Sequence, residues 1–155
     1  LRIQQIALDF GMSLKDASSS NIQFYQGKPI LIDTLSLEKY EEGKPWIAYR
    51  QFCQHFLAPL ALMTHTDLRL NQLMKVYLDG IPLDLTSKLL PKTTYFNFSL
   101  LSHIHLHAKS QQRWSNKQEK IKHVNLHLSK FQMKALVDNL TRTITNLKLN
   151  QIETE

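Results

Sequence analysis

Glycine is scarce in this sequence, and the scarcity limits the folds that the chain can adopt. Only 4 of the 155 residues are glycine, at positions 11, 27, 43 and 80. Glycine usually makes up about 7% of a protein, because tight turns and close backbone approaches need it. The composition therefore favours long helices and few tight turns. It also argues against a complete Rossmann-type or P-loop enzyme, since neither G-x-G-x-x-G nor G-x-x-x-x-G-K-[ST] occurs.

The charge and the cysteine content narrow the classes of partner and of compartment. Lysine and arginine number 19 and aspartate and glutamate 13, which gives a net charge of +6. The excess lies between residues 100 and 150, and we interpret it as a solvated helical face rather than a nucleic-acid surface. Cys53, the one cysteine, lies in an apolar stretch, which predicts a buried, inert thiol and a cytoplasmic protein. No apolar run approaches about 18 residues, so we expect no membrane-spanning helix.

One β-hairpin is expected near the start of the chain. Residues 21–25 and 30–33 favour strands, and the glycine in the intervening Gln26-Gly27-Lys28-Pro29 favours a turn. The polar segment 12–20 and the charged segment 35–45 predict loops on either side of the hairpin.

The rest of the chain has helical periodicity. Apolar residues at helical spacing predict helices over residues 1–10, 46–63, 68–78, 82–90, 97–114 and 129–149. Gly11 is expected to end the first helix, and Pro59 to kink or divide the second. Ser129 and Gln132 form a possible capping box for the last helix. The predicted fold class is α+β, mostly helical, with one β-hairpin among five or six helices.

Three polar residues around the hairpin could carry chemistry. Asp16 and Asn21 are separated by four residues on a polar loop, and Asp33 ends the second strand. This spacing allows the three side chains to converge on one point. One carboxylate could orient or deprotonate a hydroxyl, while the other carboxylate and the amide oxygen could hold magnesium. Asp and Asn are also common at turns and helix caps, where they bind local backbone N–H groups, so a purely structural role stays open.

Further polar residues could support such a pocket. Lys15 and Glu38 flank the three candidates in sequence, and Arg50 and Gln54 are spaced i and i+4 on the expected helix 46–63. Arg50 and Gln54 could face the pocket and pair with Asp33 or Glu38. A surface helix face with ordinary hydrogen bonds fits the same residues.

A histidine motif, H-x-H-x-H, lies at His103, His105 and His107. On a strand all three side chains would share one face and could bind zinc or copper. On the expected helix only His103 and His107 share a face. No cysteine or carboxylate lies close by in sequence, so we interpret the three as hydrogen-bonded or surface histidines.

The run D-x-x-x-x-N, followed by a hairpin and I-D, resembles the C-terminal lobe of kinase-like folds. The closest type is that of the aminoglycoside and fructosamine phosphotransferases. The resemblance implies that Asp16 is the catalytic base and that Asn21 and Asp33 are magnesium ligands. The sequence departs from the pattern at Leu14, where those motifs usually carry histidine. It also departs at Thr34-Leu35, where protein kinases carry Phe-Gly, and it has no glycine-rich loop and no paired N-lobe lysine.

A second resemblance rests on longer phrases. They are IDTLS at residues 32–36, PWIAYRQFC at 45–53 and HIHLH at 103–107. These phrases are similar to a group of large bacterial proteins described as class I S-adenosylmethionine-dependent methyltransferases, some of them named as nodulation-related. In that family this region lies before the methyltransferase domain. Together the two resemblances imply that residues 1–155 are one kinase-like accessory domain of a longer protein. The leucine at position 1 fits a chain that begins inside a longer protein or one that has lost residues from its start.

These observations lead to three competing hypotheses. In the first, the chain is an accessory or substrate-recognition domain without a cofactor of its own, and S-adenosylmethionine binds to a downstream methyltransferase domain of the same parent chain. Its substrate would be a small molecule or a glycan. In the second, the chain is a magnesium-dependent phosphotransferase lobe that uses Asp16, Asn21 and Asp33. In the third, it is a basic interaction module for nucleic acid or an acidic partner, which the lack of alternating basic and aromatic residues disfavours.

Overall fold

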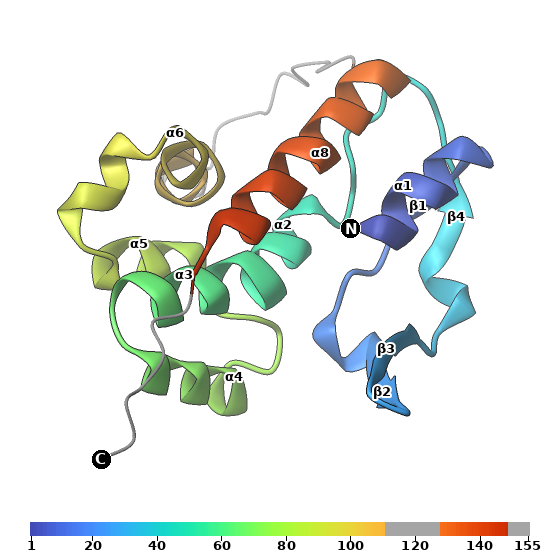
Figure 1. Cartoon of the computed structure of the whole chain (residues 1–155). Coiled ribbons are helices and arrows are strands. Elements are labelled where there is room, and N and C mark those ends of the chain that lie inside the picture. Colours follow the sequence, from blue (N-terminus) through green and yellow to red (C-terminus); the bar gives the residue numbers. More distant parts are fainter. Residues whose placement is uncertain (111–127, 149–155) are drawn as a thin grey trace, which may run out of the picture. The chain divides into compact units, whose positions relative to one another are not determined.

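The computed structural model describes residues 1–110 and 128–148, which belong to two compact units (Figure 1). Unit 1 is formed within Leu1–Phe52 and Glu119–Thr141, and unit 2 within Cys53–Gln118 and Arg142–Glu155. The regular elements of the described residues are helices and two small antiparallel sheets, so the predicted α+β, mostly helical class is confirmed. In this part of the chain, no helix has both the length and the apolar character needed to cross a membrane.

Unit 1 contains the hairpin and both strands of a second small sheet. Its elements are α1 (Arg2–Asp9), β1 (Met12–Leu14), the 3₁₀ turn η1 (Ser19–Asn21), β2 (Ile22–Tyr25), β3 (Lys28–Leu31), the 3₁₀ turn η2 (Thr34–Ser36), β4 (Leu37–Lys39), α2 (Tyr49–Phe52) and the first part of α8 (Lys130–Asn146). β2 and β3 pair antiparallel, which confirms the predicted hairpin. Gln26 and Gly27 form its two-residue turn with φ values of 50° and 74°, as hairpin turns of this length require.

The second sheet corrects the prediction of loops at residues 12–20 and 35–45. β1 pairs antiparallel with β4, so each predicted loop contains a short strand. Strands of three residues are too short to show an apolar alternation in the sequence. Gln4, fully buried in α1, anchors β1 because its Nε2 donates to Ser13 Oγ (3.0 Å) and its Oε1 accepts from the Leu14 N–H (2.7 Å).

The core of unit 1 connects α1 and α8 with the segment before α2. Trp46 is 4% exposed and its indole N–H donates to the Leu14 carbonyl (2.7 Å), so it is a core residue. The capping box at the start of α8 is confirmed: Gln132 N–H donates to Ser129 Oγ (3.3 Å) and Ser129 N–H donates to Gln132 Oε1 (2.9 Å). The buried apolar side chains of this core include Leu8, Leu14, Trp46, Met133, Val137 and Leu140.

Unit 2 is helical, and two of its helical segments are π-helical. Its elements are the π-helical η3 (Cys53–Leu57), α3 (Ala58–His65), the 3₁₀ turn η4 (Leu68–Gln72), α4 (Leu73–Val76), α5 (Leu83–Leu89), the 3₁₀ turn η5 (Lys92–Phe96), α6 (Phe98–Leu100) and the π-helical η6 (Leu101–Leu106).

The helix predicted over 46–63 begins at Tyr49 and changes to π geometry at Cys53, which is fully buried. Pro59 lies in the first turn of α3, where its missing N–H is tolerated. The ends of two predicted helices, 111–114 and 149, lie outside the described residues.

A close backbone contact fixes the loop before α5 against η3. The N–H of Ile81 donates to the Gln54 carbonyl (3.0 Å). In a π-helix this carbonyl would accept from residue 59, which is proline and has no N–H, so it can take a partner outside the helix. Gly80 has φ +89°, and a Cβ there would lie 2.7 Å from Gln54 Cβ and 3.0 Å from its carbonyl carbon. Only glycine satisfies both the conformation and the space at this position.

Candidate functional site

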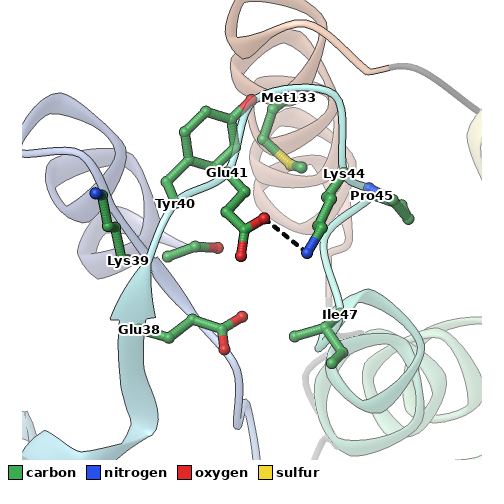
Figure 2. Close-up of a pocket in the computed structure, with 9 residues that line it drawn as sticks. Glu38, Lys39, Tyr40, Glu41, Lys44, Pro45, Ile47 and Met133 are labelled. Carbon is green, nitrogen blue, oxygen red and sulfur yellow. Dashed lines mark ion pairs between the residues drawn. The ribbon is translucent and has the colours of Figure 1, made fainter.

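A pocket of about 300 Å³ lies within unit 1, beside β4 and the loop that follows it (Figure 2). β4 and that loop supply most of its wall, and Met133 of α8 closes one side. Charged, aromatic and apolar side chains meet there: Ser13, Glu38, Lys39, Tyr40, Glu41, Lys44, Pro45, Ile47 and Met133. The pocket is therefore amphipathic, with carboxylates and ammonium groups next to apolar side chains.

One ion pair crosses the pocket, and a second carboxylate faces it. Lys44 Nζ lies 2.7 Å from Glu41 Oε2, and Figure 2 shows the Glu38 carboxylate directed toward the same space. The hydrogen bond with Lys44 lowers the pKa of Glu41, and the same bond raises the pKa of Lys44. The ion pairs of the described residues do not include Glu38. Its charge makes a small contribution to the raised pKa of Lys44, and its carboxylate can also pair with a ligand.

Backbone and side-chain bonds hold the walls of the pocket. Tyr40 N–H donates to the Gly11 carbonyl (2.9 Å), which fixes the end of β4 against the end of α1. Gly43 and Leu128 exchange two backbone hydrogen bonds, of 3.1 and 3.2 Å. The Tyr40 hydroxyl is buried, and no residue in the described ranges bonds to it. Burial, and to a smaller extent the charge of Glu42, raises the pKa of that hydroxyl.

Two of the three residues predicted as a phosphotransferase site are joined through a third residue. Asn21 Nδ2 donates to Ser36 Oγ (3.0 Å), and Ser36 Oγ donates to Asp33 Oδ2 (2.8 Å). The prediction missed Ser36, which is 1% exposed. Its position three residues after Asp33 is the signal for it, because an Asp that caps a turn often bonds a side chain at that distance.

Asp16 and Asp33 both bind local backbone groups. Asp16 Oδ1 accepts from the Ser18 N–H (2.9 Å), and Asp33 Oδ1 accepts from the Leu35 N–H (2.9 Å) at the start of η2. Lys15 lies beside this group, because its N–H donates to the Ser36 carbonyl (2.8 Å). The structure thus brings Asn21 and Asp33 together. The hydrogen bond from the Ser18 N–H to Asp16, by contrast, lies within one turn of the chain.

The supporting residues are placed differently from the prediction. Glu38 lines the pocket described above rather than pairing with Arg50, which is exposed and takes part in no ion pair between described residues. Gln54 contacts Gly80 and Ile81 in unit 2. Gln51 was missed: its Oε1 accepts from the Ala17 N–H (2.6 Å), which ties the loop after β1 to α2.

Of the three histidines in the H-x-H-x-H motif, His103 and His105 are buried. Thr94 Oγ1 donates its one hydrogen to the Pro91 carbonyl (2.7 Å), so it must accept from His105 Nε2–H (2.9 Å). Nδ1 of the neutral ring then accepts from the Ser87 hydroxyl (2.7 Å). The prediction of hydrogen-bonded histidines is confirmed for His105, and no group of three or more His, Cys, Asp or Glu residues within ranges 1–110 and 128–148 could hold a metal ion.

His105 makes the stability of unit 2 depend on pH. Burial, and to a smaller extent Lys109, lowers the pKa of His105 below 6.5, so the folded chain binds this proton less readily than the unfolded chain. The stabilisation is present above about pH 6.5 and is lost as the pH falls through the lowered folded pKa. We expect amide hydrogen exchange in α5 to accelerate more between about pH 7.5 and pH 5.5, after correction for intrinsic rates, than in a His105→Gln variant. An identical pH response in both proteins would contradict this role.

Comparison with known proteins shows one similarity to a longer protein. Over 111 residues, 72% of this chain, the sequence is 38% identical to nodulation protein NoeA of Rhizobium meliloti (strain 1021). The chain spans only 23% of the length of that protein. No family model matches the sequence, and no solved structure matches it. The similarity supports the nodulation-related part of the resemblance, whereas the kinase-like and methyltransferase parts remain hypotheses.

Proposed function

We propose that this chain is the substrate-recognition part of a longer methyltransferase-type protein, and that the pocket in unit 1 binds the substrate. The pocket carries the proposal: about 300 Å³ is the lower end of the range for small-molecule sites. The similarity to 23% of a nodulation protein supports it as well, since the matching segment of that protein is accompanied by further polypeptide. The residues present do not fit S-adenosylmethionine, because no glycine loop occurs, and the cofactor belongs to another domain in this proposal.

The chemistry of the pocket favours a small, hydroxylated ligand that carries an amine, such as an amino sugar. Glu38 offers a carboxylate without an ion-pair partner among the described residues, and a cationic amine would pair with it. Glu41 and Lys44 offer an acceptor and a donor for hydroxyl groups. Ile47, which is 70% exposed, and Pro45 provide an apolar surface for the ring.

The test measures the affinity of the chain for D-glucosamine and for the uncharged D-glucose by calorimetry. We expect glucosamine to bind more tightly than glucose. The Glu38→Gln substitution should lower the affinity for glucosamine about five-fold and leave the affinity for glucose unchanged. A five-fold change in affinity corresponds to the loss of one partly exposed charge pair of about 1 kcal/mol.

Glu42→Gln is the matched control, because Glu42 is an exposed glutamate next to Glu41 in sequence but does not line the pocket. Equal affinities for the two sugars, or equal losses in the two variants, would contradict the assignment of the amine to Glu38.

A second candidate function is a magnesium-dependent phosphotransferase lobe, and the Asn21–Ser36–Asp33 hydrogen bonds favour it. Both Asp33 oxygens accept one hydrogen bond and keep capacity for a metal ion, and Asn21 has an amide oxygen besides the nitrogen that contacts Ser36. These hard oxygen donors fit magnesium, which would neutralise phosphate charge, and Asp16 would take the position of the base. Titration of the chain with magnesium and ATP, followed by NMR at Asn21 and Asp33, separates this candidate from the first.

A further inference from the structure

The hairpin of unit 1 has one open edge and one closed edge. The N–H of Ile32 donates to the Asn21 carbonyl (3.0 Å), which makes Asn21 and Ile32 a hydrogen-bonded pair of the ladder. Such pairs alternate along an antiparallel ladder. In the register Ile22↔Leu31 and Phe24↔Pro29, the main-chain groups of these four residues therefore point away from the partner strand.

Pro29 closes the outer edge of β3. It has no N–H, so this edge lacks a donor at the centre of the strand. On β2 the N–H of Ile22 already donates to the Ser19 carbonyl within η1. The N–H and the carbonyl of Phe24 and the carbonyl of Ile22 remain on the outer edge of β2, and the structure places no third strand beside them in the residues that it describes.

The hairpin also exposes large apolar side chains on both of its strands. Phe24 is 75% exposed, Tyr25 64% and Ile30 44%, although large apolar residues are usually buried. Residues 21–27 carry no charge, and β2 has neither the lysine nor the proline that usually protects a strand edge. An isolated two-stranded hairpin is also marginally stable, and a third or fourth strand would stabilise it.

We propose that the outer edge of β2 binds β2 of a second copy of this chain, so that two hairpins form one four-stranded antiparallel sheet. A two-fold axis brings identical surfaces together, and β2 complements itself because Phe24 presents a donor and an acceptor on the same edge. The uncharged segment 21–27 is suited to this contact: although the chain carries a net charge of +6, no like charges meet along the edge. The two Phe24 side chains then lie side by side on one face of the sheet, where each covers part of the exposed surface of the other.

The test combines sedimentation with amide hydrogen exchange on the 155-residue chain. We expect the mass to rise with concentration from 18.1 kDa toward twice that value, and exchange of the Phe24 amide to slow in parallel. Phe24→Pro should hold the mass at 18.1 kDa, because it removes the outward N–H as Pro29 does on β3. The amides of Gln23 and Tyr25, which bond within the hairpin, report that this variant keeps its fold.

Phe131→Thr is the control for loss of an exposed phenylalanine, since Phe131 is 81% exposed in the same unit, on α8. Phe24→Thr, which keeps the N–H, should weaken the dimer less than Phe24→Pro does. A constant 18.1 kDa particle would overturn the proposal, as would a dimer that persists in Phe24→Pro or that Phe131→Thr also abolishes. Protection of Phe24 seen only within a longer protein would assign the edge to another domain, and would overturn it too.

Discussion

Replacing Gly80 with alanine is expected to lower the free energy of unfolding of unit 2 by about 3 kcal/mol. Two costs add at this position. A φ of +89° strains any residue with a side chain, and the new methyl group would lie 2.7 Å from Gln54 Cβ and 2.9 Å from a ring carbon of His55. Gln54 cannot move freely, because its carbonyl is held by the Ile81 N–H, and His55 is only 4% exposed. Native-state hydrogen exchange of α3 and α5 measures the loss in unit 2 directly.

Gly27→Ala separates the two costs. Gly27 has φ +74°, similar in sign and size, but a Cβ there would meet no atom within 4 Å. This variant should lose only the conformational part, about 1 kcal/mol. Equal losses at Gly80 and Gly27 would show that the close contact with η3 contributes nothing.

Gln4→Ala is expected to lower the free energy of unfolding of unit 1 by about 3 kcal/mol. Gln4 is fully buried and bonds both the Ser13 hydroxyl and the Leu14 N–H, so the substitution leaves two polar groups without a partner and opens a cavity. Because these bonds hold β1, pairing of β1 with β4 should weaken, and with it the position of Glu38 in the pocket. Urea unfolding and hydrogen exchange of β1 and β4 measure the two effects.

Gln5→Ala is the matched control for this prediction. Gln5 is the next residue of α1, and its side chain donates to Asp138 at the surface (2.5 Å). Loss of a single exposed hydrogen bond should change the stability by less than about 0.5 kcal/mol. A comparable loss in both variants would contradict the anchoring role of Gln4.

Local signals in the sequence were sufficient to predict the hairpin and the main helices. The hairpin has a two-residue turn at Gln26-Gly27, and α8 has both an apolar stripe and a capping box at Ser129. The sheet of β1 and β4 could not be predicted in this way, because it depends on a buried glutamine that lies far from β4 in sequence. The π geometry of η3 likewise accompanies a contact with Ile81, which no local pattern reveals.

The candidate site was predicted in part. The sequence selected Asn21 and Asp33, and the structure joins them, but it does so through the buried hydroxyl of Ser36. The pocket beside β4 was not predicted apart from Glu38, since its walls come from a strand that was taken as a loop and from Met133, distant in sequence. Spacing along the chain identifies residues within one turn of each other, but a pocket built from distant segments requires the fold.

The most direct test of the recognition hypothesis is residue-resolved NMR of the 155-residue chain, titrated with D-glucosamine and, separately, with magnesium and ATP. The recognition hypothesis predicts that glucosamine shifts the amide signals of Glu38, Glu41 and Lys44, and that magnesium with ATP shifts none of the signals of Asn21 and Asp33. Shifts at Asn21 and Asp33 on addition of magnesium and ATP, with no response to glucosamine at Glu38, would contradict it and favour the phosphotransferase lobe.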